Sequence, residues 1–150
     1  TIGRSVLNGV RQASRETGVD FAYLMAQAAQ ESGFQANASA PSSSAKGLYQ
    51  FIDGTWLQMM RDHGAKYGQG ELASQIQTGA RGVAYVSDPA VRQRILNLRN
   101  VPKISAALGA EYAREAERLD LREGLLESVV GGPHADSAQA RGVDQYAAAG

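Results

Sequence analysis

One apolar run limits the folds that are open to this chain. Between Phe21 and Ala29 only Gln27 is polar, and a helix that is apolar on nearly all sides is normally surrounded by other helices. Asp20 precedes the run and is a preferred N-cap residue, while Gly33 follows it and suits the left-handed conformation that ends many helices. The pattern therefore predicts a buried helix that begins after Asp20 and stops at Gly33.

Helical spacing of apolar residues recurs along the rest of the chain. It predicts further helices over 2–16, from an N-cap at Thr55 to about His63, over 71–79, from Pro89 to about Arg99 and from Pro102 to about Leu119. Residues 33–47 should form a long loop, with a small β-like turn near residues 47–52. Residues 120–150 form a weaker helical region, and no run alternates for long enough to predict a half-buried strand. The predicted fold class is all-α, with residues 1–150 as a single domain.

Composition excludes several kinds of partner and site. The 15 basic and 15 acidic side chains balance, and the pI is about 6.7, which argues against nucleic-acid binding and against attachment to anionic membranes by charge. A chain without cysteine has no disulfides, thiolate metal sites or cysteine nucleophiles. His63 and His134 lack the spacing of metal ligands, so we expect no metal and no cofactor. No apolar run approaches the length of a membrane span.

The first residue of the chain and its lack of cysteine are the features that relate to its parent protein and its cellular compartment. It begins with Thr1 rather than methionine and shows no signal peptide. We therefore expect a domain excised from a longer protein, with a leader or neighbouring domains outside this sequence. We also expect its C-terminal edge to be either divergent or cut short. The absence of cysteine fits a reducing and an oxidising compartment equally well and does not decide the location.

Glu31 stands at the end of the apolar run, where a carboxylate is costly to bury. Apolar surroundings and the negative end of the helix dipole both disfavour its charged form. Both effects should raise its pKa towards neutrality, as a general acid requires. The alternative is a solvent-facing glutamate that merely ends the helix, and the spacing alone leaves both interpretations open.

A second cluster, Ala45–Phe51, follows one loop later. Gly47 permits close approach of another backbone, and Gln50 offers an amide donor and acceptor between apolar neighbours. That combination suits a sugar site, where amides bond hydroxyl and N-acetyl groups while aromatic faces stack on the ring. The alternative is a turn that packs against the core.

Taken together, the two clusters resemble the catalytic domain of SLT-type lytic transglycosylases, which are relatives of goose-type lysozyme. The resemblance covers mainly residues 20–60. Glu31–Phe34 is similar to the family's Glu-Ser motif, and Gly47–Gln50 is similar to its Gly-Leu-Met-Gln motif at the usual spacing, with Tyr49 in place of methionine. Asp53–Trp56 stands where the family commonly has a Pro-x-Thr start to the next helix. The resemblance implies a lysozyme-like helical fold.

The third motif of the family, Ala-Tyr-Asn followed by glycine, has no direct counterpart, because the chain contains no Tyr-Asn pair. By residue type the candidates are Tyr85, Tyr112 and Tyr146. By order Tyr146 is the best match, since it lies near the C-terminus as that motif does. The resemblance implies that this tyrosine positions Glu31 or flanks the sugar ring.

The resemblance also implies a reaction. The family cleaves the β-1,4 bond between N-acetylmuramic acid and N-acetylglucosamine of peptidoglycan without water. Glu31 would protonate the leaving oxygen and then, as a carboxylate, deprotonate the muramoyl C6 hydroxyl, which closes on C1 to give a 1,6-anhydro product. Glycosidases that use water generally pair two carboxylates. The acidic residues nearest in sequence, Asp20 and Asp53, have structural explanations as an N-cap and a turn residue.

Substrate-binding roles follow by the same resemblance for Ser32, Gly47, Leu48, Tyr49, Gln50 and Tyr146. Ser32 would orient Glu31 or bond the substrate, and Gln50 with the backbone near Leu48 would hold the acetamido sugar.

Two series of arginines indicate helix surface and not a binding site. The series Arg92, Arg94 and Arg99 is interpreted as a solvated helix face. The series Arg114, Arg118 and Arg122, which stands among Glu111, Glu115 and Glu117, is interpreted as surface ion pairing.

The implied partner is the glycan strand of peptidoglycan, and the implied location is the periplasm or cell envelope. We expect a monomer and leave open a partner in a secretion or flagellar machine. Two alternatives to a transglycosylase remain. One is a muramidase of the same fold that uses water, and the other is a peptidoglycan-binding or scaffold-associated domain with weak catalysis, which the missing Tyr-Asn pair keeps open.

Overall fold

The computed structural model describes residues 1–130, with side chains described as far as Arg122. In this part of the chain the α-helices are α1 (Arg4–Thr17), α2 (Phe21–Ser32), α3 (Asp53–His63), α4 (Gly70–Ala73), α5 (Pro89–Asn97) and α6 (Pro102–Val130). Short 3₁₀ turns are η1 (Gly64–Tyr67), η2 (Ala80–Gly82) and η3 (Leu98–Asn100), and β1 (Gln77–Thr78) pairs antiparallel with β2 (Ala84–Tyr85). The predicted all-α class is confirmed.

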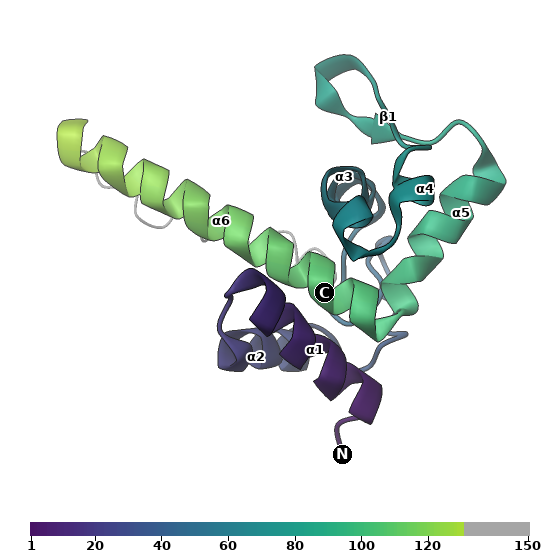
Figure 1. Ribbon diagram of the computed structural model, residues 1–150, viewed down its shortest axis with the longest axis horizontal. Helices are drawn as coiled ribbons and strands as arrows, with labels where there is room; N and C mark the ends of the chain where they lie inside the picture. Colours follow the sequence, from purple (N-terminus) through teal and green to yellow (C-terminus); the bar gives the residue numbers. More distant parts are fainter. Residues whose placement is uncertain (131–150) are drawn as a thin grey trace.

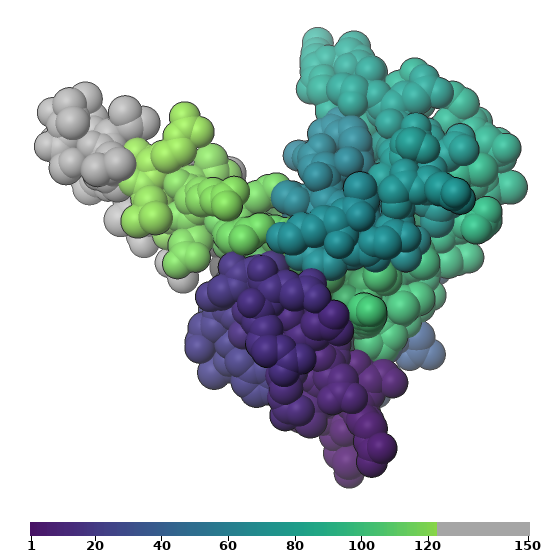
Figure 2. All heavy atoms as spheres, in the orientation of Figure 1, coloured from purple at the N-terminus to yellow at the C-terminus, as the bar shows by residue number. Residues whose placement is uncertain are grey.

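The helix α6 divides the molecule into two sides. Figure 1 shows α1 and α2 on one side of it and α3, α4, α5 and the β1–β2 hairpin on the other. Figure 1 shows the C-terminal turns of α6 extending away from both groups. In the space-filling view the part of α6 before these turns already projects from the rest of the molecule (Figure 2). No described helix is long and apolar enough to cross a membrane.

Close packing of α1 on the start of α6 depends on a glycine. A Cβ atom at Gly9 would lie 3.1 Å from the carbonyl oxygen of Pro102, so a residue with a side chain would push the two backbones apart by a few tenths of an ångström. Val6, Val10 and Ala13 lie on the same face of α1 and are buried. The amphipathic pattern of this helix therefore places it against α6.

The aromatic core lies between α3, α5 and α6. Trp56 is fully buried, and its indole nitrogen donates a hydrogen bond of 2.8 Å to the carbonyl oxygen of Ile95. The ring of Phe51 lies 5.2 Å from that of Trp56 and meets Tyr112 edge-on at 5.8 Å. These contacts anchor the residue that follows the loop 47–50 to two helices.

The predicted ends of α2 at Asp20 and Gly33 are confirmed, and α1 and α5 are bounded by residues of the same kinds. Gly18 and Gly33 end α1 and α2 in the left-handed conformation, with φ of 80° and 59°. The carboxylate of Asp20 accepts a hydrogen bond of 3.0 Å from the amide of Tyr23, and Asp88 caps α5 by accepting one of 2.8 Å from the amide of Ala90. The small β-like turn is confirmed as well, because Lys46 forms isolated bridges with residues 39 and 51.

The predicted burial of α2 is wrong. Only Leu24 and Ala28 are buried in this helix, and Tyr23 is 46% exposed. Much of its apolar character comes from alanine, which favours a helix by its intrinsic propensity and needs little burial because its side chain is small. The run therefore specified a helix but not one enclosed by others.

Three boundaries differ from the prediction. The helix α3 begins at Asp53, so that Thr55 lies inside its first turn and is not the N-cap. The helix expected over 71–79 ends at Ala73, and the chain then enters a hairpin whose strands of two residues are too short to show alternation. The helix α6 continues unbroken to Val130 instead of weakening after Leu119, and the rest of the weaker region lies outside the described residues.

A glycine in α6 gives a test of this packing. A Cβ atom at Gly109 would lie 2.7 Å from the ring of Tyr49. We expect Gly109→Ala to lower the free energy of unfolding by about 1–3 kcal/mol, because the added methyl group overpacks the contact. Gly54→Ala in α3 is the matched control, since a Cβ atom there meets nothing within 4 Å and should stabilise the chain by up to about 1 kcal/mol. Urea denaturation measures both, and equal stabilisation of the two variants would contradict this packing.

Candidate active site

The candidate acid lies on the inward stripe of α2. Glu31 follows Leu24 by seven residues and Ala28 by three, so the three side chains share one face of the helix. Leu24 and Ala28 are fully buried in the core, and Glu31 in the last turn is partly buried. The helix therefore turns this carboxylate toward the body of the protein and not into bulk solvent.

Burial changes the acidity of this group. Desolvation raises the pKa of Glu31 from its ordinary 4.5 to about 7. Among the described residues no side chain or backbone group forms a hydrogen bond or ion pair with the carboxyl group of Glu31. A carboxyl group in this state is about half protonated at neutral pH and can give or take a proton.

The hydroxyl of the neighbouring Ser32 forms a hydrogen bond within its own helix. Its hydroxyl donates a hydrogen bond of 3.1 Å to the carbonyl oxygen of Ala28, one turn earlier. This bond directs the hydroxyl along α2 and leaves Glu31 without a contact from it. A role for Ser32 in orienting Glu31 or bonding a substrate stays a prediction.

The loop Gly47–Gln50 makes a very close backbone approach at its first residue. Gly47 has φ of 86°, and a Cβ atom at this position would collide with the carbonyl oxygen of Arg99. Its amide also donates a hydrogen bond of 2.8 Å to the carbonyl oxygen of Ala38, in the segment that follows α2. Glycine is thus required here on two grounds, the positive φ and the contact with a second backbone.

Gln50 holds the same loop from within. Its side-chain amide donates hydrogen bonds of 2.9 Å and 3.1 Å to the carbonyl oxygens of Gly47 and Ala38, and the residue is 3% exposed. Its φ of 54° is unusual for a residue with a side chain and needs such contacts to persist. The donors of this amide are therefore used within the protein, and direct binding of a sugar by Gln50 stays a prediction.

Tyr49 connects the loop to the helix that carries Glu31. Its hydroxyl donates a hydrogen bond of 2.9 Å to the carbonyl oxygen of Leu24, and its ring packs on Gly109. Leu48 beside it is fully buried. The tyrosine hydroxyl, which a methionine would lack, thus joins the loop to the helix that carries Glu31. The buried side chains of Leu48 and Tyr49 maintain the shape of the loop.

Arg99 belongs to this arrangement, and the interpretation of it as part of a solvated helix face is wrong. It is 3% exposed, and its guanidinium contacts the carbonyl oxygens of Ser44 and Phe51, each at 2.9 Å, and the carboxylate of Asp53 at 2.8 Å. The partners lie about 50 residues earlier in the chain, so helical spacing contained no signal of them.

Glu111 is the second correction, because this predicted surface residue is 1% exposed. It accepts hydrogen bonds from Tyr67 at 2.6 Å, from Lys66 at 2.9 Å and from Arg114. Burial alone would raise the pKa of Glu111, but these bonds outweigh it and hold the pKa at about 2. Glu111 therefore remains ionised at neutral pH and is no second acid.

The other carboxylates near these motifs in sequence are also engaged. Asp20 caps α2, Asp53 pairs with Arg99, and Glu16 accepts a hydrogen bond of 2.8 Å from Gln12. The N-cap role of Asp20 is confirmed, whereas Asp53 lies in the first turn of α3 and not in a turn before the helix. No group of histidine and acidic side chains within the described residues could hold a metal ion.

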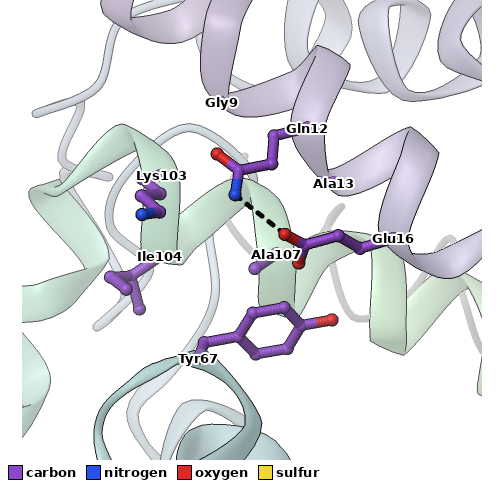
Figure 3. A pocket seen from close by; sticks show the side chains of 8 residues that line it. All are labelled: Gly9, Gln12, Ala13, Glu16, Tyr67, Lys103, Ile104 and Ala107. Carbon is purple, nitrogen blue, oxygen red and sulfur yellow. Dashed lines mark hydrogen bonds between the residues drawn. The ribbon is translucent and has the colours of Figure 1, made fainter.

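A shallow hollow lies elsewhere, between α1, η1 and α6. Figure 3 shows Gln12 and Glu16 at its rim with Tyr67 beneath them, and Ile104 and Ala107 on the side of α6. None of its lining residues comes from α2 or from the loop 47–50. It is thus a feature separate from the residues predicted to act on a substrate.

In a comparison with known protein families, residues 8–90 match a family model described as the transglycosylase SLT domain. The matched segment includes Glu31, Ser32 and the loop Gly47–Gln50, whereas Arg99 and Glu111 lie beyond its end. Tyr146, the predicted counterpart of the third motif, lies outside the described residues.

The raised pKa of Glu31 predicts how stability depends on pH. Between about pH 4.5 and pH 7 the folded chain holds a proton on Glu31 that the unfolded chain has lost, so stability falls as the pH rises through this window. One pKa unit corresponds to about 1.4 kcal/mol, and since Glu31 is only partly buried we expect a loss of about 1–2 kcal/mol. Glu31→Gln should remove this loss.

Urea denaturation of both proteins at about pH 5 and about pH 8 measures the difference. Glu71→Gln, at an exposed position in α4, is the control and should follow the wild type. If the Glu31→Gln variant lost as much stability as the wild type between the two pH values, Glu31 would not have a raised pKa.

Proposed function

Because the chain belongs to the transglycosylase SLT domain family, we propose that it cleaves the β-1,4 bond between N-acetylmuramic acid and N-acetylglucosamine, with Glu31 as acid and then as base. The family is one of lytic transglycosylases that act on peptidoglycan. The all-α, lysozyme-like fold agrees with this membership. The observation that carries the proposal is the partly buried Glu31 with a pKa of about 7.

One carboxyl group can serve both proton transfers because its pKa lies near the working pH. In its protonated form Glu31 gives a proton to the leaving glycosidic oxygen, and the bond from C1 breaks. The carboxylate that remains is basic enough to accept the proton of the muramoyl C6 hydroxyl as its oxygen bonds to C1. The products are a new chain end and a 1,6-anhydro ring, and the enzyme regains its proton.

The partners of the nearby acidic residues support ring closure over hydrolysis. A glycosidase that uses water generally needs a second carboxylate, as base or as nucleophile. Asp20, Asp53 and Glu111 each have a structural partner in helix capping or an ion pair. An internal nucleophile, the C6 hydroxyl, needs no such second group.

The loop Gly47–Gln50 and Ser32 would form the wall on which the sugar lies. Since Leu48, Tyr49 and Gln50 are buried, we propose that a glycan contacts the loop mainly through its backbone groups, whose positions those side chains maintain. The bound partner is then the peptidoglycan glycan strand, and the location is the periplasm or cell envelope where that polymer lies.

Two alternatives make different predictions. A muramidase of this fold would leave reducing muramoyl ends, because water takes the place of the C6 hydroxyl. A peptidoglycan-binding domain with weak catalysis would release few fragments of either kind. The raised pKa of Glu31 favours an enzyme over a binding domain, since binding of a neutral sugar does not require a partly buried acid.

Mass spectrometry of the fragments released from purified sacculi tests the proposal. We expect 1,6-anhydro ends from the wild type and a loss of activity of at least about a thousandfold in Glu31→Gln, because an amide cannot transfer the proton. Glu71→Gln is the matched control and should cleave like the wild type. Reducing ends as the main product would make the protein a muramidase, and full activity of Glu31→Gln would remove Glu31 from the mechanism.

A further inference from the structure

We propose that Arg99 is a positioning residue of this site, which holds the loop Gly47–Gln50 in the shape that receives the glycan. Its effect on activity rests on the proposed function, whereas its effect on the loop does not. Arg99 lies in η3, between α5 and α6, and neither a catalytic nor a binding role follows from its place in the sequence.

The guanidinium joins the two ends of the loop. Its Nη1 atom lies 2.9 Å from the carbonyl oxygen of Ser44, which precedes the loop, and 2.9 Å from that of Phe51, which follows it. Its Nε atom donates a hydrogen bond of 2.9 Å to the carbonyl oxygen of Leu96 and so fixes the side chain to the end of α5. One side chain thus ties both ends of the loop to a helix.

The backbone of Arg99 restrains the loop from the opposite direction. Its carbonyl oxygen occupies the space that a Cβ atom on Gly47 would take. The loop can neither move away from Arg99 without breaking the guanidinium contacts nor move closer without a collision. The left-handed Gln50 lies between these restraints, and such a conformation persists only where its surroundings determine it.

The buried charge is compensated within the same cluster. The carboxylate of Asp53, in the first turn of α3, lies 2.8 Å from Nη1 of Arg99. Arg92 contacts the other oxygen of this carboxylate at 3.5 Å, but its side chain is 42% exposed. Among the described residues it forms no hydrogen bond to the loop. Arg92 is therefore a matched control with the same charge and the same partner.

Arginine is the side chain that this geometry requires. It presents its donors in one rigid plane, so that Nε and Nη1 can serve different elements at once. A lysine would keep the charge opposite Asp53 but could not reach Leu96 and both loop carbonyl oxygens together. We therefore expect Arg99→Lys to be intermediate between the wild type and Arg99→Met.

The test compares Arg99→Met, Arg99→Lys and Arg92→Met. Loss of the guanidinium removes the Arg99 donor from the carbonyl oxygens of Ser44 and Phe51, the second of which still accepts from the amide of Lys46. The loop should then relax while Glu31 stays in place. We expect KM for purified glycan strands to rise about tenfold or more in Arg99→Met, with kcat within about threefold, because each lost bond to a charged group weakens the wall that holds the sugar. Arg92→Met should leave both constants within about twofold.

Hydrogen exchange of the loop amides provides a readout that does not need activity. The amides of Gly47 and Gln50 are bonded to the carbonyl oxygens of Ala38 and Gly47. They should exchange at least about tenfold faster in Arg99→Met, while the amides of α1 keep their rates. If Arg99→Met does not fold, the kinetic constants and the hydrogen exchange are measured on Arg99→Lys instead.

The outcomes are separable. Faster loop exchange together with a raised KM supports the proposal. Unchanged loop exchange in Arg99→Lys and Arg99→Met, or an exchange increase spread evenly over the whole chain, would overturn it and leave Arg99 a general stabilising residue. If the wild type released no anhydro product, the proposed function would fail, and loop exchange would still decide whether Arg99 sets the loop.

Discussion

The stretch Ala45–Phe51 has to pair its backbone polar groups within the protein, because it is largely buried instead of running over the surface. Three side chains hold this stretch in place. Gln50 serves the carbonyl oxygens of Gly47 and Ala38, Arg99 serves those of Ser44 and Phe51, and Tyr49 reaches across to Leu24. Without these bonds the buried loop, with Gln50 in a left-handed conformation, would not keep its shape, so these bonds are the constraint on which the site depends.

The acidity of Glu31 follows from the same arrangement. The hydroxyl of Tyr49 bonds to α2 at Leu24, seven residues before Glu31 and on its face of the helix, so the loop and the acid share one inward stripe. That stripe removes water from the carboxyl group but supplies no compensating donor among the described residues, and the pKa rises to about 7. Glu111 shows the opposite result of burial, since three donors surround it and lower its pKa to about 2. Whether a buried carboxylate becomes an acid or a structural anion is decided by its hydrogen-bond partners.

Much of this could be predicted from the sequence because it depends on local chemistry. Asp20, Gly33 and the helical periodicity act on neighbouring residues, and the predicted ends of α1 and α2 are correct to within two positions. Arg99 and Glu111 were misjudged because their partners lie about 45 to 55 residues earlier in the chain, where no local pattern marks them. The exposure of α2 was missed for another reason, since an alanine-rich helix is apolar in composition without needing burial on every side.

The most direct test of this account is the titration of the Glu31 carboxyl carbon, followed by NMR and assigned by its absence in Glu31→Gln. A partly buried group that meets no hydrogen-bond donor among the described residues should titrate with a midpoint near pH 7, as its pKa of about 7 requires. A midpoint near 4.5 for Glu31 would show that water or an unrecognised donor stabilises its charge, and the acid at the centre of the account would then be an ordinary surface carboxylate.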